Sequence, residues 1–189
     1  MTAQDVLDLQ GRYHLRVEDY RLLDSSGVFD SYAKTELIEG VIVAVQAQYS
    51  PHSRVQTKLL MALSAACDRL GDEVRPWVEL SVAIAPDTMP QPDIVVARGL
   101  PDSGALPTGQ VAVVVEVADT TANTDLRLKA RIYAAAGIPE YWVADVNSRL
   151  LHQMWTPSGE AYTERREVRF GERIVAATIE GLVVETAGI

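Results

Sequence analysis

The sequence has a single cysteine, Cys67, among 189 residues. It also has no apolar run of the roughly 18 residues that a membrane-spanning helix needs. One cysteine allows neither an intramolecular disulfide nor a cysteine-rich zinc site, and it fits a reducing compartment. The first residues, MTAQDVLDLQGRYHL, lack the basic start and apolar core of a secretory signal. We therefore expect a soluble, cytoplasmic protein without a membrane partner.

Basic residues are also few. Lys and Arg number 17 against 26 Asp and Glu, and the formal net charge is −9. Binding to nucleic acid usually depends on Lys and Arg that neutralise phosphates. The one basic cluster, TERREVR, alternates in sign and is typical of a solvated strand face. A role on DNA would therefore need a local basic site or a divalent metal ion.

Length and composition predict one globular domain that spans residues 1–189. With 48% hydrophobic and 23% charged residues, the chain can build one core and is too short for two comfortable domains. No repeat, low-complexity segment or linker interrupts it. We place the core at about residues 17–165, after a short N-terminal extension.

Hydrophobic periodicity predicts two long helices. The first begins with Ser50 as a candidate N-cap and Pro51 at the first helical position, and it stops at Gly71. His52 lies one turn before its apolar stripe and should point inward. The second helix is expected over residues 120–136. The stripe of the first helix consists of Val55, Leu59, Leu63, Cys67 and Leu70.

The remaining segments predict strands and one short helix. The helix is expected at residues 17–23, and a strand pair is expected around Gly40. Further strands are expected in VRPWVELSVAIAP, PDIVVA, VAVVVEVA, YWVADV, RLLHQMW and AYTERREVRF. The order predicts an α/β protein with a mixed β-sheet flanked by helices.

The most apolar strand carries an acid. In VVVEVADTT, Glu116 interrupts a run expected for a central strand that is covered on both faces. Asp93 opens the strand PDIVVA. Lys129 lies on the inner face of the following helix, because Leu126 and Tyr133 share its face. If the two strands are neighbours, the two carboxylates lie close together, and buried like charges need either protons or a cation.

Mg²⁺ or Mn²⁺ suits such a place, because these ions take oxygen ligands and keep several waters. Asp93, Glu116 and the carbonyl of Val117 are the candidate ligands. The ion would lower the pKa of a bound water and polarise a phosphodiester, while Lys129 orients the water or offsets charge on phosphorus. The alternative is an ordinary buried ion pair between Glu116 and Lys129. In that case Pro-Asp is only a residue pair that commonly marks the start of a strand.

Several segments resemble the Uma-two family: ELIEG, QPDIVVARG, VVVEVAD and DLRLKARIYAAAGIPEYWVAD, together with His52 and the final hairpin. The resemblance runs in order over residues 36–162, and GIPEYWVAD is its most specific piece. The family is assigned to the PD-(D/E)XK nuclease superfamily and is labelled as restriction endonucleases. It implies a restriction-endonuclease-like core, with Asp93 as the motif aspartate and Glu116 as the motif acid.

The resemblance also implies roles for other residues. Ala118 stands where the superfamily usually has a lysine; the family is similar in lacking it, and the displaced lysine can here only be Lys129. Glu36 and His52 match family positions, as an additional acid and as a polar lining or proton relay. Asp125 matches as well. Alternatively, His52 is a satisfied core histidine, and Asp125 is an acid that favours the helix dipole.

The sequence therefore supports two functions. The first is a Mg²⁺-dependent endonuclease that hydrolyses DNA, although EVADTTA replaces the family's usual EVLSPST and Asp119 adds negative charge beside the pocket. The second is an inactive nuclease-fold scaffold or binding module. A homodimer is expected in either case, because strand edges need cover and cleavage of two strands often uses two subunits.

Overall fold

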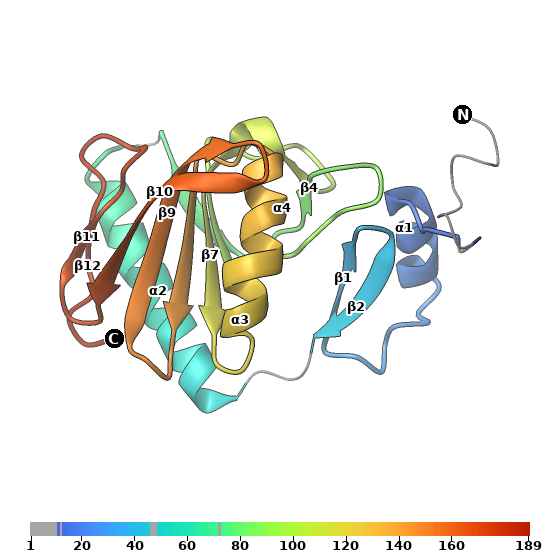
Figure 1. Cartoon of the computed structure of the whole chain (residues 1–189), viewed down its shortest axis with the longest axis horizontal. Helices are drawn as coiled ribbons and strands as arrows, with labels where there is room; N and C mark the ends of the chain where they lie inside the picture. The colour runs from blue at the N-terminus through green and yellow to red at the C-terminus, as the bar shows by residue number, and fades with distance from the viewer. Residues whose placement is uncertain (1–10, 12, 46–48, 72) are drawn as a thin grey trace.

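A computed structural model describes residues 11, 13–45, 49–71 and 73–189. Its centre is a six-stranded sheet in the order β10-β9-β8-β7-β5-β3 (Figure 1). Strands β7 and β8 pair in parallel, and the other neighbours in this sheet are antiparallel. The predicted mixed sheet is thus confirmed. The strands are β3 (Arg75–Val78), β5 (Ile94–Ala97), β7 (Val111–Ala118), β8 (Glu140–Asp145), β9 (Leu150–Ser158) and β10 (Ala161–Arg169).

The sheet is covered by helices on both faces, as predicted. Figure 1 shows α2 (Ser50–Asp68) and α4 (Ala130–Ala135) on opposite sides of it. Val113 and Val115 of β7 belong to the core cluster that contains α2, whereas Val114 and Ala118 belong to the cluster that contains α4. Side chains alternate along a strand, so Glu116 faces the α4 side together with Val114 and Ala118.

The first long helix differs from the prediction at its two ends, since it ends at Asp68 with Arg69 as its C-cap residue. Tyr49, rather than Ser50, is the N-cap residue, and its side chain makes no capping hydrogen bond. Pro51 occupies the first turn, where a backbone N–H would have no acceptor within the helix, so the proline breaks no helical hydrogen bond. The predicted stripe is confirmed for Val55, Leu59, Leu63 and Cys67, which are buried, whereas Leu70 lies beyond the last helical residue and is partly buried.

The second long helix was predicted as one regular helix over residues 120–136, which is wrong in its first half. Its parts are α3 (Ala122–Thr124), a π-helical turn η3 (Asp125–Lys129) and α4 (Ala130–Ala135). A π-turn closes its hydrogen bonds one residue later than an α-helix, and such turns are frequent at functional sites. Apolar periodicity carries no signal for this difference.

Small strand pairs surround the sheet. Glu39 and Gly40, both at positive φ, form the two-residue turn between β1 (Lys34–Ile38) and β2 (Val41–Val45). This hairpin and α1 (Val17–Ser25) lie at one end of the molecule (Figure 1). The others are β4 (Val82–Ala83), β6 (Leu106–Pro107), the 3₁₀ turn η2 (Thr108–Gln110), β11 (Arg173–Val175) and β12 (Val183–Glu185).

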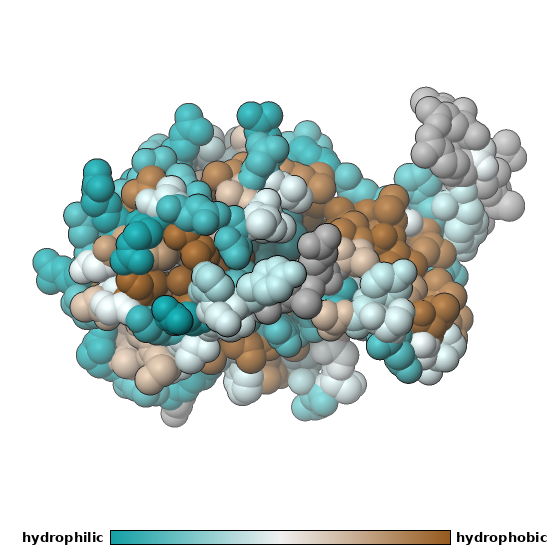
Figure 2. Space-filling model, turned by 90° about the horizontal axis from the view of Figure 1, so that it is seen from below, coloured by the Kyte–Doolittle hydropathy of each residue, from teal (hydrophilic) through white to brown (hydrophobic). Residues whose placement is uncertain are grey.

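The C-terminal hairpin lies beyond the range expected for the core. Ile174 of β11 and Val184 of β12 are fully buried in the same cluster as α2. Apolar residues also gather at the end formed by α1 and the β1–β2 hairpin (Figure 2), where Val41 is 56% exposed. Among the described residues, no helix is long and apolar enough to cross a membrane.

Candidate functional site

The sheet brings Asp93 and Glu116 to the same place. Strands β5 and β7 are antiparallel neighbours, with Ile94 paired to Val115, so the next pair in this register is Asp93 and Glu116. The backbone N–H of Val117 donates to Asp93 Oδ2 at 2.8 Å. Both acids are only 3% exposed. The expected neighbouring strands are therefore observed, although Asp93 precedes β5 by one residue.

Lys129 extends from the last position of the π-turn toward these acids. Its ammonium donates to Glu116 Oε1 at 2.9 Å and lies 3.2 Å from Glu36 Oε2. The hydroxyl of Tyr133 also donates to Glu116 Oε1, at 2.9 Å. Glu116 thus receives one charged and one neutral donor from the helix that covers its face of the sheet.

His52 binds Asp93 from the start of α2. The distance from His52 Nε2 to Asp93 Oδ2 is 3.1 Å. An ionised carboxylate can only accept, so Nε2 carries the hydrogen. Within the described part of the chain, His52 Nδ1 is buried and has no hydrogen-bond partner. His52 points inward as predicted, and it contacts an acid of the site instead of only filling the core.

Glu36 on β1 is held beside the same acids. Its Oε1 accepts the backbone N–H of Gln91 at 2.9 Å, and it is 2% exposed. The ammonium of Lys34 lies 3.8 Å from Glu36 Oε1 and 3.9 Å from Asp93 Oδ1. Sequence analysis missed Lys34. Its spacing of two residues from Glu36 on one strand was the available signal, because such residues share a face.

Asp125 lies on the π-turn and is 3% exposed. Its Oδ2 accepts the hydroxyl of Thr121 at 2.6 Å. Tyr133 was recognised from the sequence only as a residue on the face of Lys129. Its bond to Glu116 was missed, because helical spacing does not reveal which strand residue a side chain reaches.

The acids and lysines described above, together with His52, line one cavity of about 420 Å³. Four buried carboxyl groups face two ammonium groups there, so full ionisation leaves an excess of two negative charges. The half-buried Asp119 also lines the cavity and brings the excess to three. The buried carboxyl groups belong to Glu36, Asp93, Glu116 and Asp125, and the ammonium groups belong to Lys34 and Lys129.

The environment moves the pKa values of the two central acids in opposite directions. Burial raises the pKa of Glu116 to about 8; Lys129 acts against this shift, and Asp93 adds to it. Burial also tends to raise the pKa of Asp93, but the hydrogen bond from His52, the charge of Lys34 and the N–H of Val117 together hold it below its ordinary value. Opposed shifts of this kind are typical of paired acids in active sites.

The residues present fit a hard divalent cation. Among the described residues, no group of three or more His, Cys, Asp or Glu side chains is arranged to hold a metal ion. Mg²⁺, however, is usually bound through one or two carboxylates and keeps several waters. Asp93 and Glu116 supply oxygen ligands of that kind, and an ion of charge +2 would offset two of the three excess negative charges in the cavity.

A family model named Uma2 and described as "Putative restriction endonuclease" matches residues 17–187. A similar solved structure is the crystal structure of "a putative nuclease belonging to DUF820" from Anabaena variabilis ATCC 29413. It has a TM-score of 0.63 and 15% sequence identity, and the match covers 91% of this chain and 95% of that chain. At this identity the likeness shows a shared fold. No curated protein matches the chain.

Proposed function

The chain belongs to the Uma2 family, and on that premise we propose that it is a metal-dependent nuclease that hydrolyses phosphodiester bonds of DNA. The observation that carries this proposal is the convergence of Asp93, Glu116 and Lys129 in one cavity, 2.9 Å separating Lys129 Nζ from Glu116 Oε1. The family description and the fold shared with the "putative nuclease" of Anabaena variabilis support the reaction class.

Asp93 and Glu116 would hold Mg²⁺ or Mn²⁺. When bound, the ion would supply a water of lowered pKa and a Lewis acid for the phosphodiester. Two donors occupy Asp93 Oδ2, namely His52 Nε2 and the Val117 N–H. They orient the carboxylate toward the cavity that Asp93 lines. His52 is therefore a positioning residue in this proposal.

The two lysines have different roles. Lys129 is engaged by Glu116 and Glu36, so it positions these carboxylates and replaces the lysine that is usual two residues after the motif acid. It also offsets charge that develops on phosphorus. The ammonium of Lys34 lies 3.8 Å or more from its acidic neighbours, beyond hydrogen-bond distance. It is thus the cation that a substrate phosphate can recruit.

The proposal also accommodates the acidic composition. A net charge of −9 gives no general attraction for DNA. Phosphate would be held locally, by Lys34 and by the divalent cation at the carboxylates. Binding should then be weak without the metal, and it should fall only gradually with salt, because few phosphates are neutralised by cations of the protein.

A nicking assay tests the function. Supercoiled plasmid is incubated with the wild type in Mg²⁺ or Mn²⁺, and with Glu116→Ala. The control Glu167→Ala removes an exposed glutamate of β10, whose side chain is 63% exposed. We expect nicking by the wild type and the control only. No nicking by the wild type with either ion, or equal nicking by Glu116→Ala, would contradict the proposal.

A scaffold or binding module is the second candidate. It is favoured by the contacts that Glu116 and Asp93 already make within the chain without a cation. Removing one partner of a structural buried pair costs about 3–5 kcal/mol. If Lys129→Met lowers the free energy of unfolding by that amount, the pair is structural. If the variant is instead as stable as the wild type or more so, the lysine is kept for function.

The expected homodimer remains a proposal for both candidates. The edge strand β3 exposes Trp77 by 40% and Val78 by 45%. Sedimentation velocity of the wild type and of Trp77→Glu measures the association directly. A wild type that is monomeric at all concentrations contradicts a stable dimer.

A further inference from the structure

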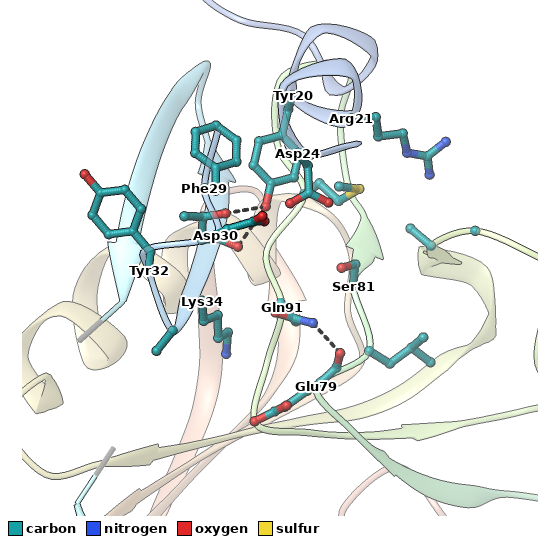
Figure 3. Close-up of a pocket in the computed structure, with 16 residues that line it drawn as sticks. Tyr20, Arg21, Asp24, Phe29, Asp30, Tyr32, Lys34, Glu79, Ser81 and Gln91 are labelled. Carbon is teal, nitrogen blue, oxygen red and sulfur yellow. Dashed lines mark hydrogen bonds between the residues drawn. The ribbon is translucent and has the colours of Figure 1, made fainter. Parts of the chain in front are cut away.

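A second cavity, of about 630 Å³, lies beside the site (Figure 3). Its volume falls within the range of about 300–1,000 Å³ that is typical of ligand pockets. One wall comes from α1 and the loop after it, and the other comes from the segments that flank β4. The residues that matter here are Tyr20, Phe29 and Tyr32 on the first wall and Glu79, Ser81 and Gln91 on the second.

This cavity is joined to the site by shared residues. Lys34 lines both cavities, and its ammonium lies 3.9 Å from Asp93 Oδ1. The backbone N–H of Gln91 donates to Glu36 in the site, and the Gln91 side chain donates to the Glu79 carbonyl at 2.6 Å (Figure 3). A molecule that fills the second cavity therefore lies next to anything held at Asp93.

The charges of the second cavity disfavour phosphate. Its charged lining residues are two cations, Arg21 and Lys34, and three anions, Asp24, Asp30 and Glu79. Full ionisation leaves one excess negative charge. Carboxylates accept hydrogen bonds from exocyclic amino groups of bases, as from cytosine N4. The cavity is therefore suited to the donor edge of a base, while Lys34 at the boundary is suited to the phosphate.

One aromatic ring is available for stacking. Tyr20 and Phe29 already stack on each other, with ring centroids 5.8 Å apart, and the Tyr20 hydroxyl donates to the Thr35 carbonyl. Tyr32, in contrast, is 55% exposed. An exposed aromatic face binds unpaired bases with little dependence on sequence.

We propose that this cavity binds an unpaired nucleobase bearing an exocyclic amino group, stacked on Tyr32, with its phosphate at Lys34 on the boundary of the two cavities. The inference rests on the proposed nuclease function and specifies its substrate: DNA in which a nucleotide beside the cleaved bond is single-stranded or flipped out. Taking a base out of a duplex costs a few kcal/mol, so single-stranded or distorted DNA should be preferred.

The test uses a single-stranded oligonucleotide that carries one 2-aminopurine, in EDTA and low salt, so that nothing is cleaved. The wild type should quench its fluorescence, and Tyr32→Ala should bind at least about fivefold more weakly without quenching. Tyr32→Leu keeps an apolar side chain but removes the ring, and it should show the same loss. Tyr13→Ala, which removes an exposed aromatic residue that lines neither cavity and is not on the edge strand β3, is the matched control.

Competition adds the base preference. An oligonucleotide of cytosines should displace the probe at lower concentration than one of thymines, because thymine has no exocyclic amino group. Equal binding and quenching by Tyr32→Ala and Tyr32→Leu, both with the wild-type melting temperature, would overturn the inference.

The nicking assay is read separately. Quenching that depends on Tyr32 without nicking supports the base site and removes the proposed nuclease function. Nicking by the wild type, with binding that does not depend on Tyr32, supports the nuclease function and removes the base site.

Discussion

Glu116 and Glu140 are buried glutamates on the neighbouring strands β7 and β8, but their hydrogen-bond partners differ in kind. Glu140 is 0% exposed, and within the described residues its hydrogen-bond donors are all neutral. Trp142 Nε1 donates to Oε1 at 2.6 Å and Gln153 Nε2 donates at 2.5 Å. Oε2 accepts the N–H groups of Ala177 and Thr178 at 2.9 Å and the Thr178 hydroxyl at 2.8 Å.

Glu116 instead shares its cavity with four other acids and two lysines. The donors to Glu140 tie residues 177–178 to the sheet, which is a structural task that neutral groups complete. The donors to Glu116 leave an excess of negative charge in a cavity. Burial of an acid is thus no sign of function by itself; the sign is a buried charge that the chain leaves uncompensated.

Substituting Gln at each position tests this contrast most strongly. Glu116→Gln should lower the nicking rate at least about 100-fold, a barrier change of about 2.7 kcal/mol, and should change stability little at pH 5, where Glu116 is protonated. Glu140→Gln should lower the free energy of unfolding by about 3 kcal/mol, because a carboxamide cannot accept from donors on both of its ends. Its nicking rate should stay near that of the wild type. Plasmid nicking and urea unfolding give the two numbers, and a reversed pattern would refute the contrast.

The pH dependence of stability should identify Glu116. Its pKa is about 8 in the folded protein against an ordinary 4.5, so the folded state binds more protons between these values. The stability that Glu116 contributes is therefore full below about pH 4.5 and is lost as the pH rises to about 8. At about 1.4 kcal/mol per pH unit, the unfolding free energy of Glu116→Gln should rise relative to that of the wild type by up to about 5 kcal/mol over this window.

The control for pH is Glu167→Gln, which replaces an exposed glutamate and should parallel the wild type. Asp93 has the opposite sign: its pKa is lowered, so its contribution is present above its ordinary value of 3.8 and is lost only as the pH falls below it. A flat difference between Glu116→Gln and the wild type from pH 5 to 8 would contradict the assignment.

Mg²⁺ should stabilise the protein at the Glu116 cavity and not at Glu140. At ten times its dissociation constant, a ligand of the folded state adds about 1.4 kcal/mol. The gain should be larger at pH 8.5 than at pH 6, because the ion needs ionised carboxylates. Melting temperatures in MgCl₂ and in NaCl of equal ionic strength measure it. If the double variant Asp93→Asn/Glu116→Gln shows the same increase in melting temperature with MgCl₂, the ion binds elsewhere.

The smallest effect separates two buried tyrosines. The Tyr133 hydroxyl donates to Glu116, whereas the Tyr141 hydroxyl donates to the backbone carbonyl of Asp125 at 3.1 Å. Replacing either by Phe should cost about 1 kcal/mol of stability. Only Tyr133→Phe should also change the nicking rate. Equal rates in both variants would show that Tyr133 has no role in orienting Glu116.

Much of the fold could be predicted because buried faces repeat at the period of their own secondary structure. The apolar stripe of α2 and the uniform apolarity of β7 are local patterns of this kind. The π-turn at Asp125–Lys129 could not be predicted. Each of its backbone hydrogen bonds spans one residue more than in an α-helix, and the amino-acid composition does not reveal this difference. Lys34 was missed because a lysine near a strand end is ordinary in sequence.

The sequence by itself determined which acids and amines are held against apolar surroundings, since Glu116 and Lys129 interrupt patterns that span only a few residues. Only the tertiary structure decided their partners. His52 and Asp93 are 41 residues apart, and Lys129 and Glu36 are 93 residues apart. Strand order and register set those distances, and the period of a helix or strand contains no information about which element packs beside it.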